Sequence, residues 1–598
     1  MNRTDYIPVD EARTLPGLFL KRVQRSAGIT AYHQYDPGTT RWNRYTWGET
    51  AREVGRWQAA LEAEGLKAGD RIGIMLRNCR EWVLLEQAAL GLGMVVVPLY
   101  TNDRAGNVAY IVNDATVKLL LIEGGETWHN IREARDQFGP LKRILTLQRV
   151  EDPDDDRLLH ADDWLPAGGR EPAEPDLYPQ QLATIVYTSG TTGRPKGVML
   201  SHHNILWNAW ASTRIVPVYT DDLFLSFLPL SHMFERTVGH YIPILAGAQV
   251  AYARSIPELA EDLRTMRPTV LISVPRIFER VYNKIQAGLE EKPPLARRLF
   301  QAAVDVGWQR FQVRQKRAAW TPRLLLHPLL HALVGRKVMA GLGGRLRVSI
   351  SGGAPLSVDI ARTFIGLGLE LIQGYGLTET SPVISANPPD DNDPASVGVP
   401  LPDVEVRIGE DDELLVRSPG VMLGYWNNDE ATRAAIDRDG WFHTGDQARI
   451  ERDHIYITGR IKEILVLANG EKVPPADVEM AIANDPLFEQ VMVVGEGRPY
   501  MAAIAVLEKD HWRELARSLD LDPDDPAALT SDKATEAVLD RIHDQMKAFP
   551  GYAQIYRVIL TLEPWTVEDG LITPTLKLRR KQIMERFADR IEALYAGH

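Results

Sequence analysis

The residues that most clearly suggest chemistry form a loop rich in glycine and hydroxyl groups, TSGTTGRPKG, at residues 188–197. Glycines let consecutive backbone N–H groups turn towards one point, hydroxyl groups add donors and the lysine adds positive charge, so the loop is suited to hold phosphate. It is not a Walker A loop, because Pro195 stands where that motif has its second glycine. The predicted phosphate contacts in this loop are Thr188, Ser189, Gly190, Thr192, Gly193 and Lys196.

The string YTSGTTGRPKG resembles the signature loop of the adenylate-forming superfamily, which comprises acyl-CoA synthetases, luciferases and the adenylation domains of peptide synthetases. Further strings resemble that family's other motifs and follow the family's order. They are LPLSHMFER (228–236), SISGGAPL (349–356), QGYGLTET (373–380), GWFHTGD (440–446), GRIKEI (459–464) and LITPTLKLRR (571–580). The resemblance extends over nearly the whole chain and implies an enzyme that joins a carboxylate to the α-phosphate of ATP.

Adenylation brings two anions together, so charge on the phosphoryl group must be neutralised. The resemblance implies that Mg²⁺ supplies part of this neutralisation and that Glu379 and Thr191 hold it. It also implies that Lys577 contacts the carboxylate and the α-phosphate, and that Lys462 marks the hinge of a small C-terminal domain. These four residues are the predicted catalytic residues.

The same motifs imply a nucleotide site. Asp446 has two carboxylate oxygens that suit the two ribose hydroxyls, and Tyr375 offers a flat face for adenine. Arg460 has a fixed charge and a fork geometry suited to ribose or phosphate. The other nucleotide contacts implied by the resemblance are Gly353, Ala354, Gln373, Gly374 and Thr378.

Within the superfamily the chain most resembles the long-chain fatty acid–CoA ligases, through QGYGLTET, LITPTLKLRR and VLANGEKVPPADVE (466–479). This likeness implies fatty acid, ATP and CoA as substrates. The acyl site is expected at His232, Phe234, Thr237 and Gly239. Related enzymes can place a tryptophan gate after this histidine, but none stands between His232 and Val250.

Three alternatives remain open at this point. The first is a fatty acyl-AMP ligase that loads a carrier protein, and the second is a CoA ligase for a medium-chain or aryl acid. The third belongs to another class, a nucleotide-binding regulator or membrane-docked scaffold with an inactive site. Glu379, Asp446, Lys462 and Lys577 are all present, which disfavours the third.

The elements that must position these residues follow an alternating pattern. Residues 46–100 read as helix, strand, helix and strand, and similar apolar runs continue towards residue 351, which predicts parallel sheets covered by helices. Residues 283–345 form a cationic helical insertion, which is expected either to pack on its own domain or to lie on a membrane surface.

The predicted fold is α/β with two domains. Residues 1–459 are expected to form a large domain of layered, mostly parallel sheets with helices and a distorted β-barrel. Residues 460–598 are expected to form a small, mobile α+β domain that pivots near Lys462.

The composition excludes several other classes. The 598 residues are 44% hydrophobic and carry a net charge of −12, which disfavours a nucleic-acid partner. The single cysteine, Cys79, rules out an internal disulfide and is expected to be structural. The N-terminus lacks the apolar core of a signal peptide and no run of 18 apolar residues occurs, so a cytoplasmic protein is expected. Peripheral contact with the inner face of a membrane and homodimerisation are left open.

Overall fold

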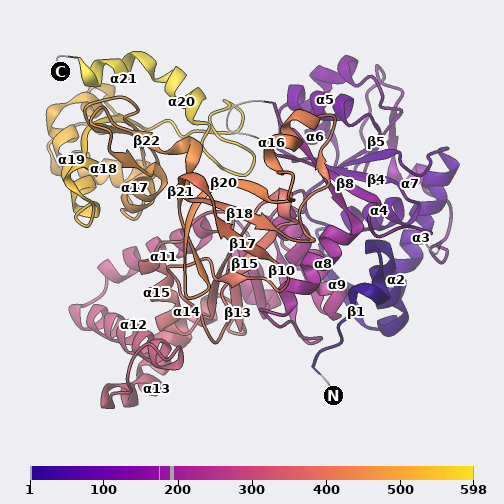
Figure 1. The fold of residues 1–598 in the computed structure, drawn as a ribbon, viewed down its shortest axis with the longest axis horizontal. Helices are drawn as coiled ribbons and strands as arrows, with labels where there is room; N and C mark the ends of the chain where they lie inside the picture. The colour runs from indigo at the N-terminus through magenta and orange to yellow at the C-terminus, as the bar shows by residue number, and fades with distance from the viewer. Residues whose placement is uncertain (1–2, 174–175, 189–193, 597–598) are drawn as a thin grey trace.

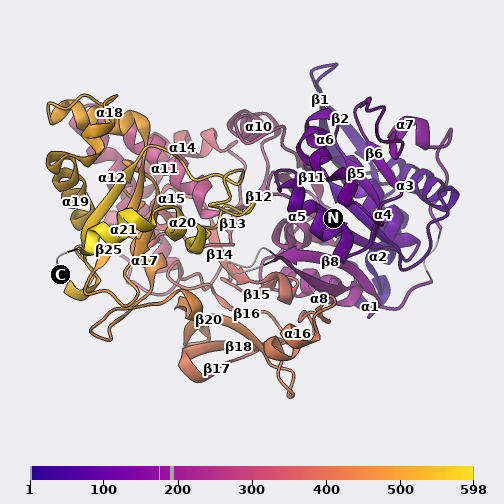
Figure 2. The same ribbon diagram turned by 90° about the horizontal axis from the view of Figure 1, so that it is seen from above.

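The computed structural model describes residues 3–173, 176–188 and 194–596, which form a large N-terminal part and a smaller C-terminal part (Figure 1). The large part contains two mainly parallel sheets and one antiparallel sheet. Figures 1 and 2 show the C-terminal part at the opposite end of the molecule from α2 (Leu15–Ser26) and α3 (Trp47–Ala63).

The first large sheet leads into the predicted phosphate loop. In spatial order its eight strands are β19 (Gly424–Tyr425), β9 (Lys196–Ser201), β8 (Leu182–Thr188), β4 (Val95–Pro98), β3 (Arg71–Met75), β5 (Val117–Ile122), β6 (Arg143–Thr146) and β7 (Leu158–His160). Neighbours from β8 to β7 are parallel. Parallel strands are covered on both faces, which explains their nearly continuous apolar runs. Here α4 (Arg80–Gly91) lies on one face, and α5 (Ala105–Asp114) and α6 (Gly125–Ile131) lie on the other.

The second large sheet carries most of the other predicted motifs. In spatial order its nine strands are β16 (Val399–Pro400), β15 (Val383–Ala386), β14 (Leu371–Gly376), β13 (Val348–Ser351), β12 (Val270–Ser273), β10 (Leu223–Ser226), β11 (Gln249–Tyr252), β1 (Thr30–Asp36) and β2 (Arg41–Thr46). Successive strand residues face opposite sides. Phe224 faces a core shared with the first sheet, whereas Leu225 faces α11 (Pro275–Glu290) and α15 (Val358–Leu367).

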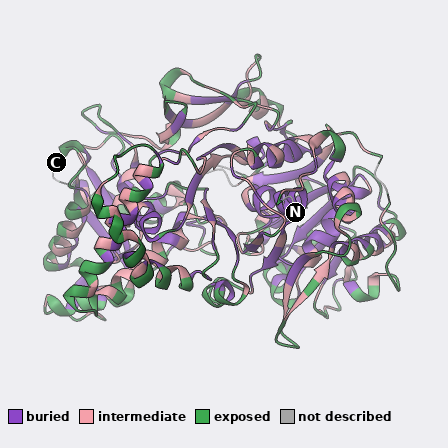
Figure 3. Ribbon diagram, turned by 90° about the horizontal axis from the view of Figure 1, so that it is seen from below, coloured by how far each residue is buried: buried purple, intermediate pink, exposed green. Residues whose placement is uncertain are grey.

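A layer of helices lies between the two large sheets. It contains α4, α8 (His202–Thr213), the π-helix η2 (Glu235–Tyr241) and α9 (Ile242–Ala246), whose apolar side chains belong to the largest hydrophobic core. The layers therefore run helix, sheet, helix, sheet, helix. Figure 3 shows the strands of both sheets buried, with exposed residues on the outer helices and loops.

The predicted helical insertion is the connection between the parallel neighbours β12 and β13. It begins with α11 and continues through α12 (Pro294–Arg314), η3 (Pro322–Leu326), α13 (His327–Leu330), η4 (His331–Gly335) and α14 (Arg336–Gly341). Helix α12 packs closely on α15, because a Cβ on Gly307 would lie 1.8 Å from the carbonyl oxygen of Gly366. Through α12, the insertion therefore packs on its own domain.

The region expected to form a distorted β-barrel is a four-stranded antiparallel sheet. Its strands are β17 (Glu405–Ile408), β18 (Glu413–Arg417), β20 (Phe442–Glu451) and β21 (His454–Arg460). The backbone N–H of Val397 donates to the carbonyl of Ile455, and that of Ile455 donates to Gly398, each over 2.9 Å. These bonds attach β21 beside the β16 end of the nine-stranded sheet.

The C-terminal part is built around its own sheet of β24 (Phe488–Val494), β25 (Met501–Leu507) and β26 (Ile555–Thr561). Strand β25 is apolar throughout, because both of its faces are covered. Met501, Ala503, Ala505 and Leu507 face one core with α17 (Pro475–Ile482), α18 (Lys509–Ser518) and α19 (Asp532–Gln545). Ala502, Ile504 and Val506 face another with α20 (Arg580–Arg586) and α21 (Ala588–Tyr595). The part therefore has hydrophobic cores of its own.

Within the described residues, no helix combines the length and the apolar composition that a membrane span needs.

A buried ion pair joins the central helical layer to the first sheet. Arg236 of η2 donates through Nε to Glu86 Oε1 of α4 over 2.7 Å, and through Nη1 to the hydroxyl of Thr184 in β8 over 2.8 Å. The Tyr241 hydroxyl donates to Glu86 Oε1 over 2.6 Å, and His240 Nε2 lies 2.8 Å from Glu86 Oε2. Burial alone would raise the pKa of Glu86, but the positive charge of Arg236 and these hydrogen bonds hold it at about 2.

We predict that Glu86→Gln lowers the free energy of unfolding by about 3–5 kcal/mol, because Arg236 becomes an unpaired buried charge. The folded-state pKa of Glu86 lies below its ordinary value of 4.5, so its contribution is present above pH 4.5 and is lost as the pH falls towards 2. Urea unfolding between pH 7 and pH 3 measures both effects. Glu405→Gln, which removes an exposed ion pair with Arg417, is the control and should leave unfolding nearly unchanged. Equal effects of the two substitutions would contradict this prediction.

Candidate active site

The predicted motifs meet because parallel strands of the nine-stranded sheet end at one edge. Strands β10, β13 and β14 lead directly into the segments 228–236, 352–356 and 377–380. Ligands of open α/β sheets bind outside the carboxyl ends of the strands. The first sheet brings the end of β8, Thr188, to the same place.

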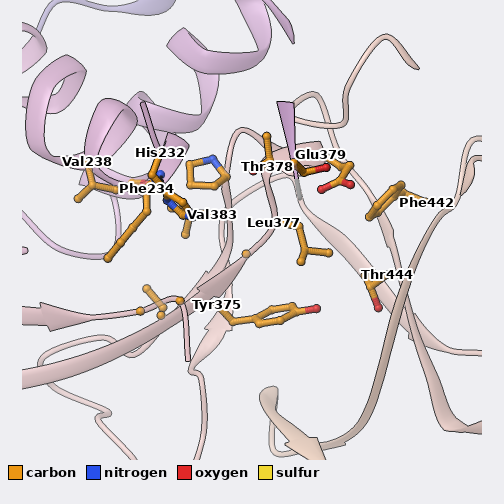
Figure 4. Close-up of a pocket in the computed structure, with 18 of the residues that line it drawn as sticks. His232, Phe234, Val238, Tyr375, Leu377, Thr378, Glu379, Val383, Phe442 and Thr444 are labelled. Carbon is orange, nitrogen blue, oxygen red and sulfur yellow. Dashed lines mark hydrogen bonds between the residues drawn. The ribbon is translucent and has the colours of Figure 1, made fainter. Parts of the chain in front are cut away.

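A cavity of about 620 Å³ lies at this edge. The predicted site residues that line it are Thr188, Lys196, His232, Phe234, Gly353, Gly374, Tyr375, Thr378, Glu379, Arg460, Lys462 and Lys577. Figure 4 shows His232, Phe234, Val238 and Val383 on one side, Glu379, Phe442 and Thr444 on the other, and Tyr375 across from both groups. One end of the cavity is therefore apolar and the other is polar.

Lys577 enters the polar end from the C-terminal part. Its loop is fixed by Thr573, whose hydroxyl accepts from the Lys577 N–H over 3.1 Å and whose own N–H donates to the Lys577 carbonyl over 2.8 Å. The ammonium is open to the cavity but enclosed by protein. This enclosure, and next the charge of Arg460, lower the pKa of Lys577, while Asp446 and Glu379 oppose the shift. The site therefore holds a cation that an anionic ligand would stabilise.

Asp446 holds two other predicted site residues in place. The Tyr375 hydroxyl donates to Asp446 Oδ2 over 2.5 Å, and Arg460 Nε donates to Oδ1 over 2.8 Å. Burial, and then the Asp446 carboxylate, raise the pKa of Tyr375, so its hydroxyl stays protonated. Burial works to lower the pKa of Arg460, but Asp446 outweighs it and raises that pKa. Asp446 itself is buried and is not among the described residues of the cavity lining, so in this structure it supports the site through Tyr375 and Arg460.

Glu379 is the carboxylate of the polar end. Its Oε1 accepts from the Tyr425 hydroxyl over 2.9 Å, and the Lys196 ammonium lies 4.9 Å from the centre of the Tyr425 ring. In the described residues, no cluster of three or more His, Cys, Asp or Glu side chains is arranged to hold a metal. A single carboxylate beside a phosphate site fits Mg²⁺, which binds through one or two carboxylates together with substrate phosphates and water. Thr191, the second predicted ligand, lies outside the described residues.

His232 lies between the two ends. Its Nδ1 accepts the backbone N–H of Phe234 over 3.2 Å. Burial, and then Lys577, lower the pKa of His232 to about 4, so the ring is neutral near pH 7. A neutral ring that accepts at Nδ1 carries its proton on Nε2, and His232 is therefore a hydrogen-bond donor at that atom.

Two of the four residues predicted for the acyl site, His232 and Phe234, line the cavity. Phe234 lines the cavity together with Val238 and Ile242, which follow it at intervals of four. Thr237 and Gly239 are not among the described residues of the cavity lining. The Thr237 hydroxyl donates to the Ser381 carbonyl over 2.8 Å, and a Cβ on Gly239 would lie 2.4 Å from Glu235 Oε1.

The wall of the apolar arm includes residues that the sequence analysis missed. Val348, Ile350 and Gly352 alternate along β13 and all line it, as expected for one face of a strand. A Cβ on Gly352 would lie 2.9 Å from the Phe234 ring, so glycine lets that ring lie against the strand. Further apolar lining residues of the cavity include Val216, Val218, Phe224, Val238, Ile242, Val270, Val383 and Ala386. Nothing in their types separates them from ordinary core residues.

The remaining predicted residues support the site or lie apart from it. The Gln373 side chain accepts the Leu356 N–H over 3.1 Å and donates to the Pro394 carbonyl over 2.6 Å, so it fixes the loop after β13. Ala354 is exposed and, like Gln373, is not among the described lining residues. Ser189, Gly190, Thr192 and Gly193 lie outside the described residues. The polar residues that line the cavity but were not predicted from the sequence are Arg194, Ser212, Glu413, Tyr425, His443 and Thr444.

Cys79 takes no part in the cavity lining that the structure describes. The thiol is buried in the core between the two large sheets. Burial, and then Glu81, raise its pKa, so it stays a thiol.

Comparison with protein families gives two matches on this chain. Residues 19–426 match the AMP-binding enzyme family, and residues 462–598 match the AMP-binding enzyme C-terminal domain.

Two similar proteins span nearly the same length. A long-chain-fatty-acid–CoA ligase of Mycobacterium bovis, FadD15, is 33% identical over 571 residues, covering 93% of this chain and 92% of that protein. The peroxisomal long chain acyl-CoA synthetase 6 of Arabidopsis thaliana is 30% identical, covering 93% of this chain and 82% of that protein.

Solved structures share the fold. The adenylation domain of a carboxylate reductase from Mycobacterium chelonae superposes with a TM-score of 0.76 at 23% identity, covering 98% of this chain and 91% of that one. The anthranilate CoA ligase AuaEII, solved with anthranoyl-AMP, gives a TM-score of 0.73 at 19% identity, covering 98% and 99%.

Proposed function

The chain belongs to the AMP-binding enzyme family, and we propose that it is a long-chain fatty acid–CoA ligase. In the first half-reaction it joins a fatty acid to ATP, giving acyl-AMP and pyrophosphate. In the second it transfers the acyl group to CoA, giving acyl-CoA and AMP. The supporting relatives carry this activity in their names over almost the full length of this chain.

The observation that carries the proposal is a single cavity with two chemically different ends. Lys577, Arg460 and Lys462 supply positive charge at one end, where a nucleotide phosphate would lie. The other end continues into an apolar arm between β13 and the helix face of Phe234 and Val238. A carboxylic acid with a long alkyl chain matches both ends at once.

In the first half-reaction, a carboxylate oxygen attacks the α-phosphorus and the bond from that phosphorus to the bridging oxygen of pyrophosphate breaks. Lys577 reduces the repulsion between the two anions, because its ammonium lies at the polar end between them. His232 donates from Nε2 to the acid and needs no proton transfer to do so. Tyr375, Asp446 and Arg460 hold the adenosine.

Magnesium is the expected metal of this step. Glu379 would hold it together with the ATP phosphates, and Thr191 is proposed as the second protein ligand. When bound, the metal supplies charge neutralisation on the phosphates.

In the second half-reaction, the CoA sulfur attacks the acyl carbonyl, the bond from that carbon to AMP breaks, and the thiol proton passes to solvent. Lys577 occupies the cavity in this structure, so we propose that residues 460–598 rotate about Lys462 to withdraw it and admit CoA. The domains meet through polar contacts such as Arg276 Nη1 to the Glu489 carbonyl (3.0 Å) and Arg104 Nε to the Val567 carbonyl (3.2 Å). Contacts of this kind can be exchanged at little cost.

We predict that Lys577→Ala lowers the rate of acyl-AMP formation by about 10²–10³-fold, because a preorganised cation at the reacting phosphate is lost. Thioester formation from supplied acyl-AMP and CoA should stay close to the wild-type rate. Pyrophosphate release measures the first step and acyl-CoA formation measures the second. Lys547→Ala, an exposed lysine of the same domain, is the control. If Lys577→Ala slowed both steps equally, the rotation would be refuted.

The apolar arm sets the expected chain-length preference. From Gly352 back to Val348 it follows β13 for about 13 Å, given a rise of about 3.3 Å per residue. A short or aryl acid would leave the Val348 end unfilled and lose apolar burial there.

Val348→Phe should therefore shorten the arm and shift the preference. We expect kcat/KM for C16 and C18 acids to fall at least about tenfold, corresponding to the burial of roughly two methylene groups, while C8 is nearly unaffected. The assay uses acids from C2 to C20 with aryl acids, ATP and CoA, and detects AMP and thioester. Val358→Phe, at an exposed valine of α15, is the control.

The same assay decides between the proposal and its alternatives. A wild-type preference for short or aryl acids would overturn the long-chain assignment. Formation of acyl-AMP without thioester in the presence of CoA would instead identify a fatty acyl-AMP ligase that serves a carrier protein.

We further propose that the enzyme works in the cytoplasm and docks on the inner face of a membrane through its helical insertion. Five large apolar side chains at residues 320–333 are 47–72% exposed: Trp320, Leu325, Leu326, Leu329 and Leu333. Their spacing places the leucines on one face of the helical segment. Figure 1 shows α13 at a corner of the molecule, where a flat surface can reach it.

The charge around these side chains favours an anionic lipid surface over another protein. Residues 306–358 contain nine basic and no acidic residues, although the whole chain has a net charge of −12. Lys316, Arg336 and Lys337 are exposed beside the leucines, while Arg323 lies 4.0 Å from Asp305. Exposed apolar side chains bordered by cations are typical of helices that lie in a membrane interface.

We predict that the enzyme sediments with phosphatidylglycerol vesicles and much less with phosphatidylcholine vesicles. Leu325→Ser with Leu329→Ser should weaken this binding at least about tenfold, because two exposed leucines no longer enter the interface. Leu295→Ser, at a similarly exposed leucine in the first turn of α12 and outside the segment 320–333, is the control. Concentration-dependent dimerisation that the double variant abolishes, without vesicle binding by the wild type, would show that a second copy covers this face.

A further inference from the structure

A second cavity, of about 490 Å³, lies between the N-terminal and C-terminal domains. Helix α5, Gln137 and the end of the glycine-rich loop form one side, and the start of α20 forms the other. The described lining residues are Gly106, Asn107, Ala109, Tyr110, Asn113, Gln137, Arg194, Pro195, Arg579, Lys581 and Gln582. Three of them are cations and none is a carboxylate, so the lining favours an anion.

Arg579 is one of these three cations. Its Nε atom is buried and has no protein hydrogen-bond partner in the described residues. Burial, and then the nearby Arg104 guanidinium, lower its pKa, and Asp103 offsets this only in part. A buried guanidinium N–H without a partner is costly unless a ligand accepts from it.

Arg194 connects the two cavities. Its side chain lines both the nucleotide cavity and the second one, and its guanidinium lies 5.4 Å from the centre of the Tyr110 ring. Arg194 is therefore a cation shared by the walls of both cavities. The Asn107 amide donates to Asp103 Oδ1 over 2.9 Å and has a second N–H that can donate to a diphosphate oxygen.

In this structure the same segment of the C-terminal part lines both cavities. Lys577 lines the nucleotide cavity, whereas Arg579 and Lys581, two and four residues later, line the second cavity. One short segment therefore supplies cations to both cavities. A rotation of the C-terminal domain would remove Lys577, Arg579 and Lys581 from the two cavities together.

We infer that this second cavity binds the diphosphate released from ATP, holding it through Arg194, Arg579 and Lys581 before it leaves. The inference rests on the proposed function for the source of that diphosphate. Bound diphosphate bridges the two domains, so it also stabilises the arrangement used for adenylation. Its departure therefore has to precede domain rotation and the attack of CoA.

The test measures binding of inorganic pyrophosphate to the full chain by titration calorimetry, at about 0.15 M ionic strength to limit non-specific attraction. Arg579→Gln with Lys581→Gln should weaken pyrophosphate binding at least tenfold and raise its inhibition constant for acyl-AMP formation by a similar factor. Lys547→Gln, which removes a positive charge from the same domain outside the cavity, should leave both values unchanged. Thermal unfolding of each variant verifies that it is folded.

The outcomes separate this inference from the proposed function. Equal pyrophosphate affinity in the double variant and the wild type would overturn it, and so would equal weakening by Lys547→Gln, because net charge would then explain the binding. Loss of CoA binding with unchanged pyrophosphate binding would assign the cavity to the CoA phosphates and also overturn it. If the wild type forms no acyl-AMP from any acid yet binds pyrophosphate at these residues, the proposed function fails and the anion site stands.

Discussion

The architecture depends on a charge buried between two sheets. Glu86 of α4 is bound by Arg236, His240 and Tyr241 of η2, and Arg236 also reaches Thr184 of β8. Strand β8 leads into the phosphate loop, and η2 follows the His232 motif directly. An ion pair without solvent is favourable only in a close geometry supported by further hydrogen bonds. The pair therefore ties η2 and α4 of the central helical layer to strand β8 of the first sheet.

The site joins two requirements that would conflict in one uniform environment. An alkyl chain needs a dry wall, which one face of β13 and the helix face of Phe234 supply. The meeting of a carboxylate with a phosphate needs concentrated positive charge, which Lys462 and Lys577 bring. Lys577 belongs to a domain with hydrophobic cores of its own. In the proposed rotation, this domain withdraws the Lys577 ammonium while the apolar lining of the cavity stays folded. This separation suits an enzyme that must neutralise charge in one step and admit a thiol in the next.

A site residue could be predicted from the sequence where its chemical role follows from the residue types of one short segment. Tyr375, Glu379 and Lys577 stand in short strings whose residue types carry the chemistry, and all three line the cavity. Thr237 and Gly239 were predicted from the region around Phe234, but they contact Ser381 and Glu235 and are not among the described lining residues. Val348 and Ile350 could not be recognised, because a buried valine in a strand looks the same whether it contacts a core or a substrate.

The sequence by itself determined the α/β class, the alternating elements and the identity of the charged groups, because periodicity and motif chemistry are local properties. It also predicted the insertion, although α11 begins earlier, at Pro275. Only the tertiary structure decided which residues share a cavity, that Asp446 is bound by both Tyr375 and Arg460, and that Arg579 lies in a second, cationic cavity. These facts depend on contacts between residues far apart in the chain. Their geometry is set by how the sheets and the two domains pack, which no single segment encodes.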